Sequence, residues 1–155
     1  MQQRRCCVSI NPNYFDMTLI GIDTGVHTGF AVYDTDLKAL ESVKEYTIHR
    51  AMDIVKQLYD EGKDIKVRFE DARKRTWFGY HTAKEDRARL QGAGSVKRDC
   101  QIWEDYLTDL RIPFEMVAPK NNATKLTAEQ FRRITGYEGK TNEHGRDAAM
   151  LVYGF

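Results

Sequence analysis

The sequence has few cysteines and no long apolar run, and each absence excludes a class of protein. Its three cysteines, Cys6, Cys7 and Cys100, are odd in number and form no CxxC pair, which argues against a secreted disulfide framework and favours a reducing compartment. No stretch approaches the roughly 18 apolar residues of a membrane-spanning helix, and no apolar signal core follows Arg4 and Arg5. We therefore expect a cytoplasmic protein without a membrane role.

Net charge is also small, because the 24 Lys and Arg residues are nearly balanced by 23 Asp and Glu residues. Only a local basic patch can therefore bind a polyanion such as nucleic acid. The length of 155 residues suits one domain that buries its own core and leaves no room for a second. Residues 1–16 read as a polar leader without periodicity, so we expect the functional domain to span residues 17–155.

Hydrophobic periodicity predicts an α/β domain built on a five-stranded mixed sheet flanked by helices. The predicted strands cover residues 18–23, 29–33, 43–48, 65–70 and 113–117. Short links make the first three antiparallel, and crossover helices, the first ending at Gly62, make the fourth and fifth parallel to the first. A second helix is predicted over residues 95–110, a third after the capping box of Thr127 and Gln130, and a last from Glu143.

Metal-type ligands stand at three remote places in this pattern. Asp23 ends the first strand, Glu70 ends the fourth, and His144 and Asp147 share one face of the last helix because they are three residues apart. Parallel strands bring Asp23 and Glu70 to the same edge, where open α/β sheets bind ligands. Three carboxylates and one imidazole suit Mg²⁺ or Mn²⁺, and paired ions of this kind hydrolyse phosphodiesters.

The residue pattern leaves simpler roles open for each candidate. Asp23 fits an ordinary turn, His144 a helix start, and Asp147 an acidic residue favoured by the helix dipole. Glu70 competes with Asp71, since successive strand residues point to opposite faces and only one of the two can line the site. Alternation places Asp71 with Phe69, and the strand can also end before Asp71.

Three segments together resemble the RuvC family of Holliday-junction resolvases, a branch of the ribonuclease H-like superfamily. They are residues 20–25 (IGIDTG), the strand ending in Phe69 and Glu70, and residues 144–149 (HGRDAA). Residues 89–96 (RLQGAGSV) are similar to the family's glycine-bearing turn into its long helix, and residues 117–119 (VAP) to its last strand and basic loop. The resemblance covers residues 18–153, implies a ribonuclease H-like fold, and favours Glu70 over Asp71.

The resemblance also implies roles for individual residues. It makes Asp23, Glu70, His144 and Asp147 the catalytic, metal-binding set, with two Mg²⁺ ions per site and Mn²⁺ as a possible substitute. Many members carry Asp where His144 stands, so the site here has one negative charge fewer. The family's phosphate-stabilising lysines correspond to Lys120 and Lys125, although their spacing departs from the usual pattern.

Basic and aromatic residues are interleaved after the fourth strand. Beside a nuclease site, Arg73, Lys74 and Arg75 would hold backbone phosphates. Trp77, Phe78 and Tyr80 would stack on bases or wedge between them at a branch point, as an aromatic does in the junction-contacting loop of RuvC-like proteins. The alternative is a solvated loop whose aromatics dock on the core.

These features predict a homodimeric, Mg²⁺-dependent endonuclease that resolves four-way DNA junctions, with the dimer expected because two symmetric nicks need two sites related by a two-fold axis. One alternative is another ribonuclease H-like nuclease that acts on broader branched DNA or on RNA/DNA hybrids. A second is an ATP-binding protein of the actin and sugar-kinase type, whose phosphate loop resembles residues 21–25 but which needs a second domain. A third is an inert DNA-binding scaffold on the same fold.

Overall fold

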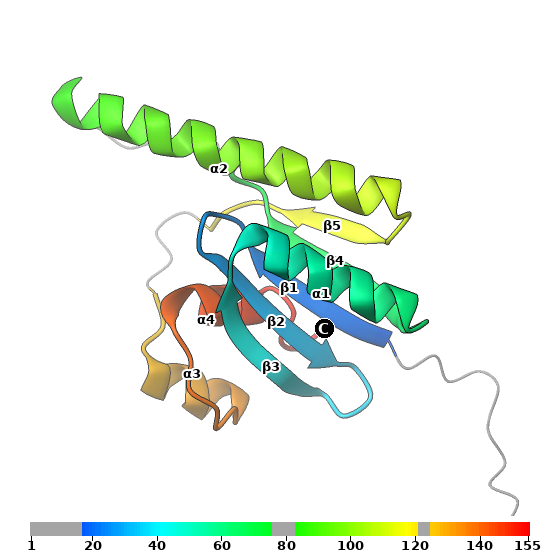
Figure 1. Ribbon diagram of the computed structural model, residues 1–155. Helices are drawn as coiled ribbons and strands as arrows, with labels where there is room; N and C mark the ends of the chain where they lie inside the picture. Colours follow the sequence, from blue (N-terminus) through cyan, green and yellow to red (C-terminus); the bar gives the residue numbers. More distant parts are fainter. Residues whose placement is uncertain (1–16, 76–82, 121–124) are drawn as a thin grey trace, which may run out of the picture.

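The computed structural model describes residues 17–75, 83–120 and 125–155 (Figure 1). The helices and strands follow the predicted order along the chain. The strands are β1 (Met17–Asp23), β2 (Thr28–Asp34), β3 (Ala39–Tyr46), β4 (Asp64–Glu70) and β5 (Phe114–Val117). The helices are α1 (Ile48–Asp60), the 3-10 turn η1 (Ala72–Lys74), α2 (Ala83–Asp109), α3 (Ala128–Thr135) and α4 (Glu143–Met150). The predicted leader at residues 1–16 lies outside the described residues.

The five strands form one mixed sheet in the order β3-β2-β1-β4-β5. The pairs β1–β2 and β2–β3 are antiparallel, while β4 runs parallel to both β1 and β5. This is the predicted mixed sheet. In the parallel pair, Ile22 lies opposite Phe69, so the next residues, Asp23 and Glu70, leave the sheet at the same edge.

Helices cover both faces of the sheet. Helices α1 and α2 pack on one face around Trp103, Ile20 and Phe69, and α3 and α4 pack on the other around Phe131 and Ala148 (Figure 1). Strand β1 contributes to both cores, which explains its nearly continuous apolar sequence. The fold is therefore a three-layer α/β/α arrangement with the ends of β1 and β4 between its layers.

Two glycines let α4 lie directly on the sheet. A Cβ atom at Gly21 would stand 2.1 Å from the carbonyl oxygen of Ala148, and one at Gly29 would stand 1.9 Å from that of His144. Side chains at these two positions would push the helix away from β1 and β2. The glycines thus set the height of α4, and of the residues it carries, above the sheet.

The long helix begins earlier than predicted. Helix α2 starts at Ala83 rather than at residue 95, so the predicted glycine turn at 89–96 is helical. The N-terminal half of α2 projects beyond the sheet (Figure 1). Gly92 and Gly94 face open space, where each costs about 1 kcal/mol relative to Ala without breaking the helix. Among the described residues, none of the helices combines the length and the hydrophobicity that a membrane span requires.

The third strand is also displaced from its predicted limits of 43–48. It starts at Ala39, because the Asp34 carboxylate accepts hydrogen bonds from the backbone of Asp36 and Leu37 and holds a tight turn before it. It ends at Tyr46, and Ile48 instead opens α1 and packs on the core. Apolar side chains at a strand end and at a helix start look alike in sequence.

Candidate active site

Asp23 and His144 meet at the end of β1, although 121 residues separate them in the chain. The Oδ2 atom of Asp23 lies 3.0 Å from Nδ1 of His144, which stands in the first turn of α4. Their side chains are 17% and 41% exposed. Among the described residues, none forms a hydrogen bond with Nε2 of His144.

Glu70 lies on the same face of the sheet as Asp23. Ile65, Val67 and Phe69 point into the core under α1 and α2, so alternation directs Glu70 to the opposite face, where α4 lies. Burial raises the pKa of Glu70, and the nearby charge of Asp23 adds to the rise. The fold therefore brings the Glu70 carboxylate, and not that of Asp71, close to Asp23.

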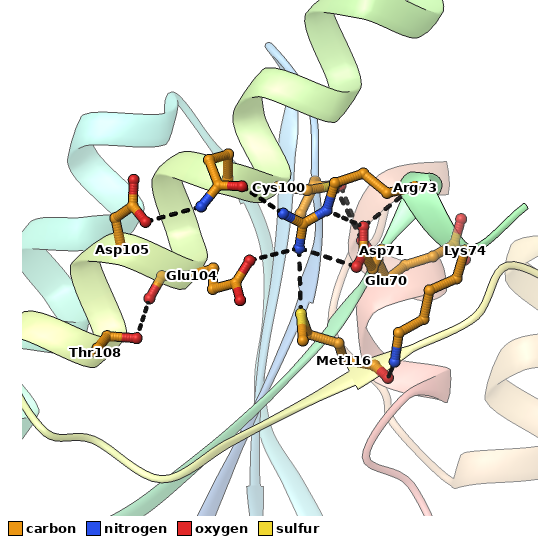
Figure 2. Close-up of polar contacts among 11 residues, drawn as sticks. Glu70, Asp71, Arg73, Lys74, Cys100, Glu104, Asp105, Thr108 and Met116 are labelled. Atoms are coloured by element: carbon orange, nitrogen blue, oxygen red, sulfur yellow. Dashed lines mark hydrogen bonds and ion pairs between the residues drawn. The ribbon is translucent and has the colours of Figure 1, made fainter.

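Asp71 belongs to a different network on the α2 side (Figure 2). It is buried and accepts hydrogen bonds from the backbone and the guanidinium of Arg73. Although burial opposes the effect, these bonds hold the pKa of Asp71 below its usual value. Arg73 also pairs with Glu104 at 2.7 Å and donates to Gln101. The network attaches the turn after β4 to helix α2.

The predicted DNA-binding residues fall into three groups. The donors of Arg73 are engaged within the fold, so a phosphate contact by this residue requires breaking its bonds to Asp71 and Glu104. Lys74 donates to the carbonyl of Met116 (Figure 2), whereas Arg75 is exposed and near enough for its charge to oppose the rise in the pKa of Glu70. The predicted aromatics lie outside the described residues; they are Trp77, Phe78 and Tyr80.

Asp147 follows His144 by one helical turn and carries an ion pair. Lys125 donates to its Oδ2 atom and lies 3.5 Å from Glu143. Lys125 thus lies at the predicted site. Lys120 is exposed after β5, and no hydrogen bond or ion pair joins it to another part of the chain that the structure describes.

The four charged groups at this edge influence one another. Burial raises the pKa of Asp23, and the charge of Asp147 adds to the rise, while the hydrogen bond with His144 opposes it. Lys125 lowers the pKa of both Asp23 and Glu70 by its charge. In turn, although its own burial acts in the other direction, the bond to Asp147 raises the pKa of Lys125. The site therefore holds an excess of negative charge.

The donor atoms of the predicted ligand residues are of the kinds that bind a divalent cation. Within the described ranges, no three His, Cys, Asp or Glu side chains converge closely enough, as they stand, to hold one metal ion. The donor types nevertheless suit Mg²⁺ or Mn²⁺, since they are carboxylate oxygens and one imidazole without thiolates. Burial is the main cause of the raised pKa values of Asp23 and Glu70, and the charge of Lys125 only partly opposes these rises. Binding a cation through Asp147 would require this carboxylate to release Lys125.

Sequence reasoning missed the residues that support the site from behind. Thr24 donates to the backbone carbonyl of Glu70 at 3.1 Å, and its hydroxyl lies 3.3 Å from Sγ of Cys100. These contacts join the ends of β1 and β4 to α2. Nothing in the sequence marks them, because a turn threonine and a buried helix cysteine are common on their own.

The comparisons support the fold. No protein-family model and no curated protein matches the sequence. Among solved structures, the chain is similar to RuvC of T. thermophilus in complex with a Holliday junction substrate, with a TM-score of 0.56 and 17% sequence identity. The match covers 88% of this chain and 91% of that one. The chain therefore has the ribonuclease H-like fold of RuvC, as predicted.

Proposed function

We propose that this protein is a metal-dependent, structure-selective DNA endonuclease that resolves four-way junctions by phosphodiester hydrolysis. The proposal rests chiefly on one observation: Asp23, Glu70 and Asp147 gather at one edge of the sheet, where His144 is bonded to Asp23. The fold supports it, because the similar RuvC structure contains a Holliday junction. We assign the nuclease to residues 17–155.

The metal-binding set in this proposal is Asp23, Glu70, His144 and Asp147. Two bound Mg²⁺ ions, or Mn²⁺ in their place, would supply an activated water and stabilise the leaving oxygen. Asp23 links the other ligands of the proposed set. Its charge raises the pKa of Glu70, and its carboxylate is hydrogen-bonded to the ring of His144. With Nδ1 committed to Asp23, His144 presents Nε2 as its free ligand atom.

Lys125 neutralises part of the site before substrate arrives. Its ammonium forms ion pairs with Asp147 and Glu143, and its side chain is 57% exposed. A phosphodiester entering the site brings negative charge that the same ammonium can hold. Arg75, whose charge also lowers the pKa of Glu70, supplies a second positive charge for the DNA backbone.

A symmetric dimer completes the proposed activity. Resolution of a four-way junction requires two nicks related by a two-fold axis, and a C₂ homodimer places two identical sites in that relation. The account therefore includes dimerisation, which sedimentation of the purified protein at several concentrations would measure.

Cleavage of a panel of nucleic acids tests the proposal. The purified protein with Mg²⁺ is incubated with a labelled four-way junction, a Y-fork, a linear duplex and an RNA/DNA hybrid. Paired nicks in the junction, at symmetric positions, are the expected result. Preferential cleavage of the hybrid or of all branched DNA would instead indicate a ribonuclease H-like nuclease of broader specificity. Binding of the junction without cleavage under any divalent metal would indicate an inert scaffold.

A further inference from the structure

Glu45 lies in register with Asp23 of the candidate site, two strands away in the sheet. Asp23 on β1 is opposite Gly29 on β2, and Gly29 is opposite Glu45 on β3. Paired residues of neighbouring strands share a face, so the carboxylates of Asp23 and Glu45 stand on either side of a position without a side chain. The backbone of His144 lies over that position, because its carbonyl would contact a Cβ atom at Gly29.

Glu45 reaches the residues around His144 by two routes. Its Oε1 atom is 3.0 Å from Nδ1 of His27, whose ring stacks on that of His144 with centroids 6.0 Å apart and planes 17° apart. Its Oε2 atom accepts a hydrogen bond from the amide of Asn142. Asn142 caps α4 by accepting from the backbone of Gly145 at 2.9 Å. One carboxylate therefore contacts both the neighbour of the His144 ring and the start of its helix.

We propose that Glu45 is a positioning residue for the candidate site, acting through His27 on the ring of His144 and through Asn142 on the first turn of α4. The inference rests on the proposed function, because it assigns Glu45 a part in that same site. His144 needs such support, since its side chain is 41% exposed and, among the described residues, Asp23 alone forms a hydrogen bond with its ring. Partners that orient a ligand imidazole in this way typically change metal affinity or activity by about 10–100-fold when removed.

The exposure of the pair argues against a purely stabilising role. The side chains of His27 and Glu45 are 70% and 28% exposed, and even an ion pair between solvent-exposed side chains contributes little to stability. Glu45→Ala should therefore leave Tm within about 3 °C of the wild-type value and still disturb the site. A residue important only for folding would show the reverse.

Four variants of the full chain test the inference. Glu45→Ala removes the contacts with both His27 and Asn142. His27→Ala removes the ring that stacks on His144, whereas His27→Phe keeps an aromatic ring there and loses only the hydrogen bond with Glu45. Glu41→Ala serves as the control, because Glu41 is an exposed acidic residue of the same strand with no hydrogen bond or ion pair to the other described residues. It removes the same charge without touching either route.

Three readouts are compared: the NMR signal of the His144 ring in the metal-free protein, Mn²⁺ affinity by calorimetry, and kcat and KM for junction cleavage. Glu45→Ala should shift the ring signal, weaken Mn²⁺ binding and lower kcat by about 10–100-fold, with KM for the junction nearly unchanged. His27→Ala should lose more than His27→Phe, and Glu41→Ala should match the wild type.

The possible results separate this inference from the proposed function. An unchanged His144 signal, Mn²⁺ affinity and kcat in Glu45→Ala would overturn the positioning role even if the wild type cleaves junctions. A wild type that cleaves nothing in the substrate panel removes the proposed function, while the ring signal and Mn²⁺ affinity still decide whether Glu45 orients His144. If Glu45→Ala does not fold, the same comparison is made with Glu45→Gln, which can accept from only one of its two partners.

Discussion

Glu70 and Asp71 are adjacent in sequence, yet their carboxylates lie on opposite faces of the sheet. Glu70 points towards Asp23 beneath α4. Asp71 points towards α2, where its carboxylate accepts hydrogen bonds from the guanidinium of Arg73. The strand geometry produces this separation, because successive side chains of an extended chain alternate between faces. We therefore expect the two neighbouring acidic residues to differ in their effects, Glu70 on the proposed activity and Asp71 on stability.

Exchanging each of these carboxylates for its amide should separate the two roles. Glu70→Gln should lower junction cleavage by at least about a hundredfold, since it removes a charged ligand of the proposed metal site, and it should fold normally. Asp71→Asn should destabilise the protein by about 2 kcal/mol, because it leaves Arg73 without its buried counter-charge. Cleavage rates and urea unfolding of both variants provide the measurement. Loss of activity in a fully stable Asp71→Asn variant, with Glu70→Gln active, would reverse the assignment.

Asp23→Asn should stabilise the folded protein at neutral pH while abolishing cleavage. Burial raises the pKa of Asp23 above 3.8, so the folded state holds this proton more tightly than the unfolded state does. Ionisation of the Asp23 carboxyl therefore lowers the free energy of unfolding, and this loss develops as the pH rises from about 4 through the raised pKa of the folded state. Thermal unfolding of both proteins between pH 3 and pH 8 checks this, with Tm rising about 2–4 °C for each kcal/mol gained. The advantage of the variant should shrink at acidic pH, and a variant less stable than wild type at pH 7 would contradict the account.

Gly29→Ala should displace the first turn of α4. The new methyl group would stand 1.9 Å from the carbonyl oxygen of His144, and overpacking of this kind costs about 1–3 kcal/mol. Both stability and cleavage should fall. Gly94→Ala is the matched control on α2, where the methyl group meets open space and should add about 1 kcal/mol to helix stability. Equal Tm values for the two variants would show that α4 does not lie on β2 as described.

Lys125→Met should make the DNA-free protein bind Mg²⁺ more tightly, because the ammonium that occupies Asp147 is removed. The gain should be roughly tenfold, the change that 1.4 kcal/mol of electrostatic competition produces. Cleavage should nevertheless slow, since the phosphodiester loses a positive charge. Calorimetry with Mg²⁺ checks the affinity, and Lys120→Met, which removes an exposed lysine outside the contacts of the site, should leave that affinity unchanged. Weaker Mg²⁺ binding by Lys125→Met would contradict the competition.

The sheet and its carboxylates were predictable because their signals are local. An apolar run ends at Asp23, another ends at Glu70, and the helix between them makes the two strands parallel. The 3.6-residue period placed His144 and Asp147 on one face of α4. These patterns depend on residues close together in the chain, which single-sequence periodicity records well.

The remaining features depend on contacts that periodicity does not record. The bond between Asn142 and Glu45 joins residues 97 positions apart, and neither residue stands out in its own segment. Arg73 reads as a free basic residue until Glu104 of α2 is placed beside it. Gly92 and Gly94 suggested a turn, yet exposed glycines can continue a helix whose flanking residues are strong helix formers.

Junction cleavage by the wild type and by Asp23→Asn tests the central claim most directly. Each purified protein is incubated with a labelled four-way junction in Mg²⁺ or in EDTA, and the cut positions on all four strands are mapped. We expect the wild type to make paired symmetric nicks only with Mg²⁺, and Asp23→Asn to bind the junction without cutting it. Cleavage that persists in EDTA, or in the Asp23→Asn variant, would contradict a metal-dependent centre built on Asp23.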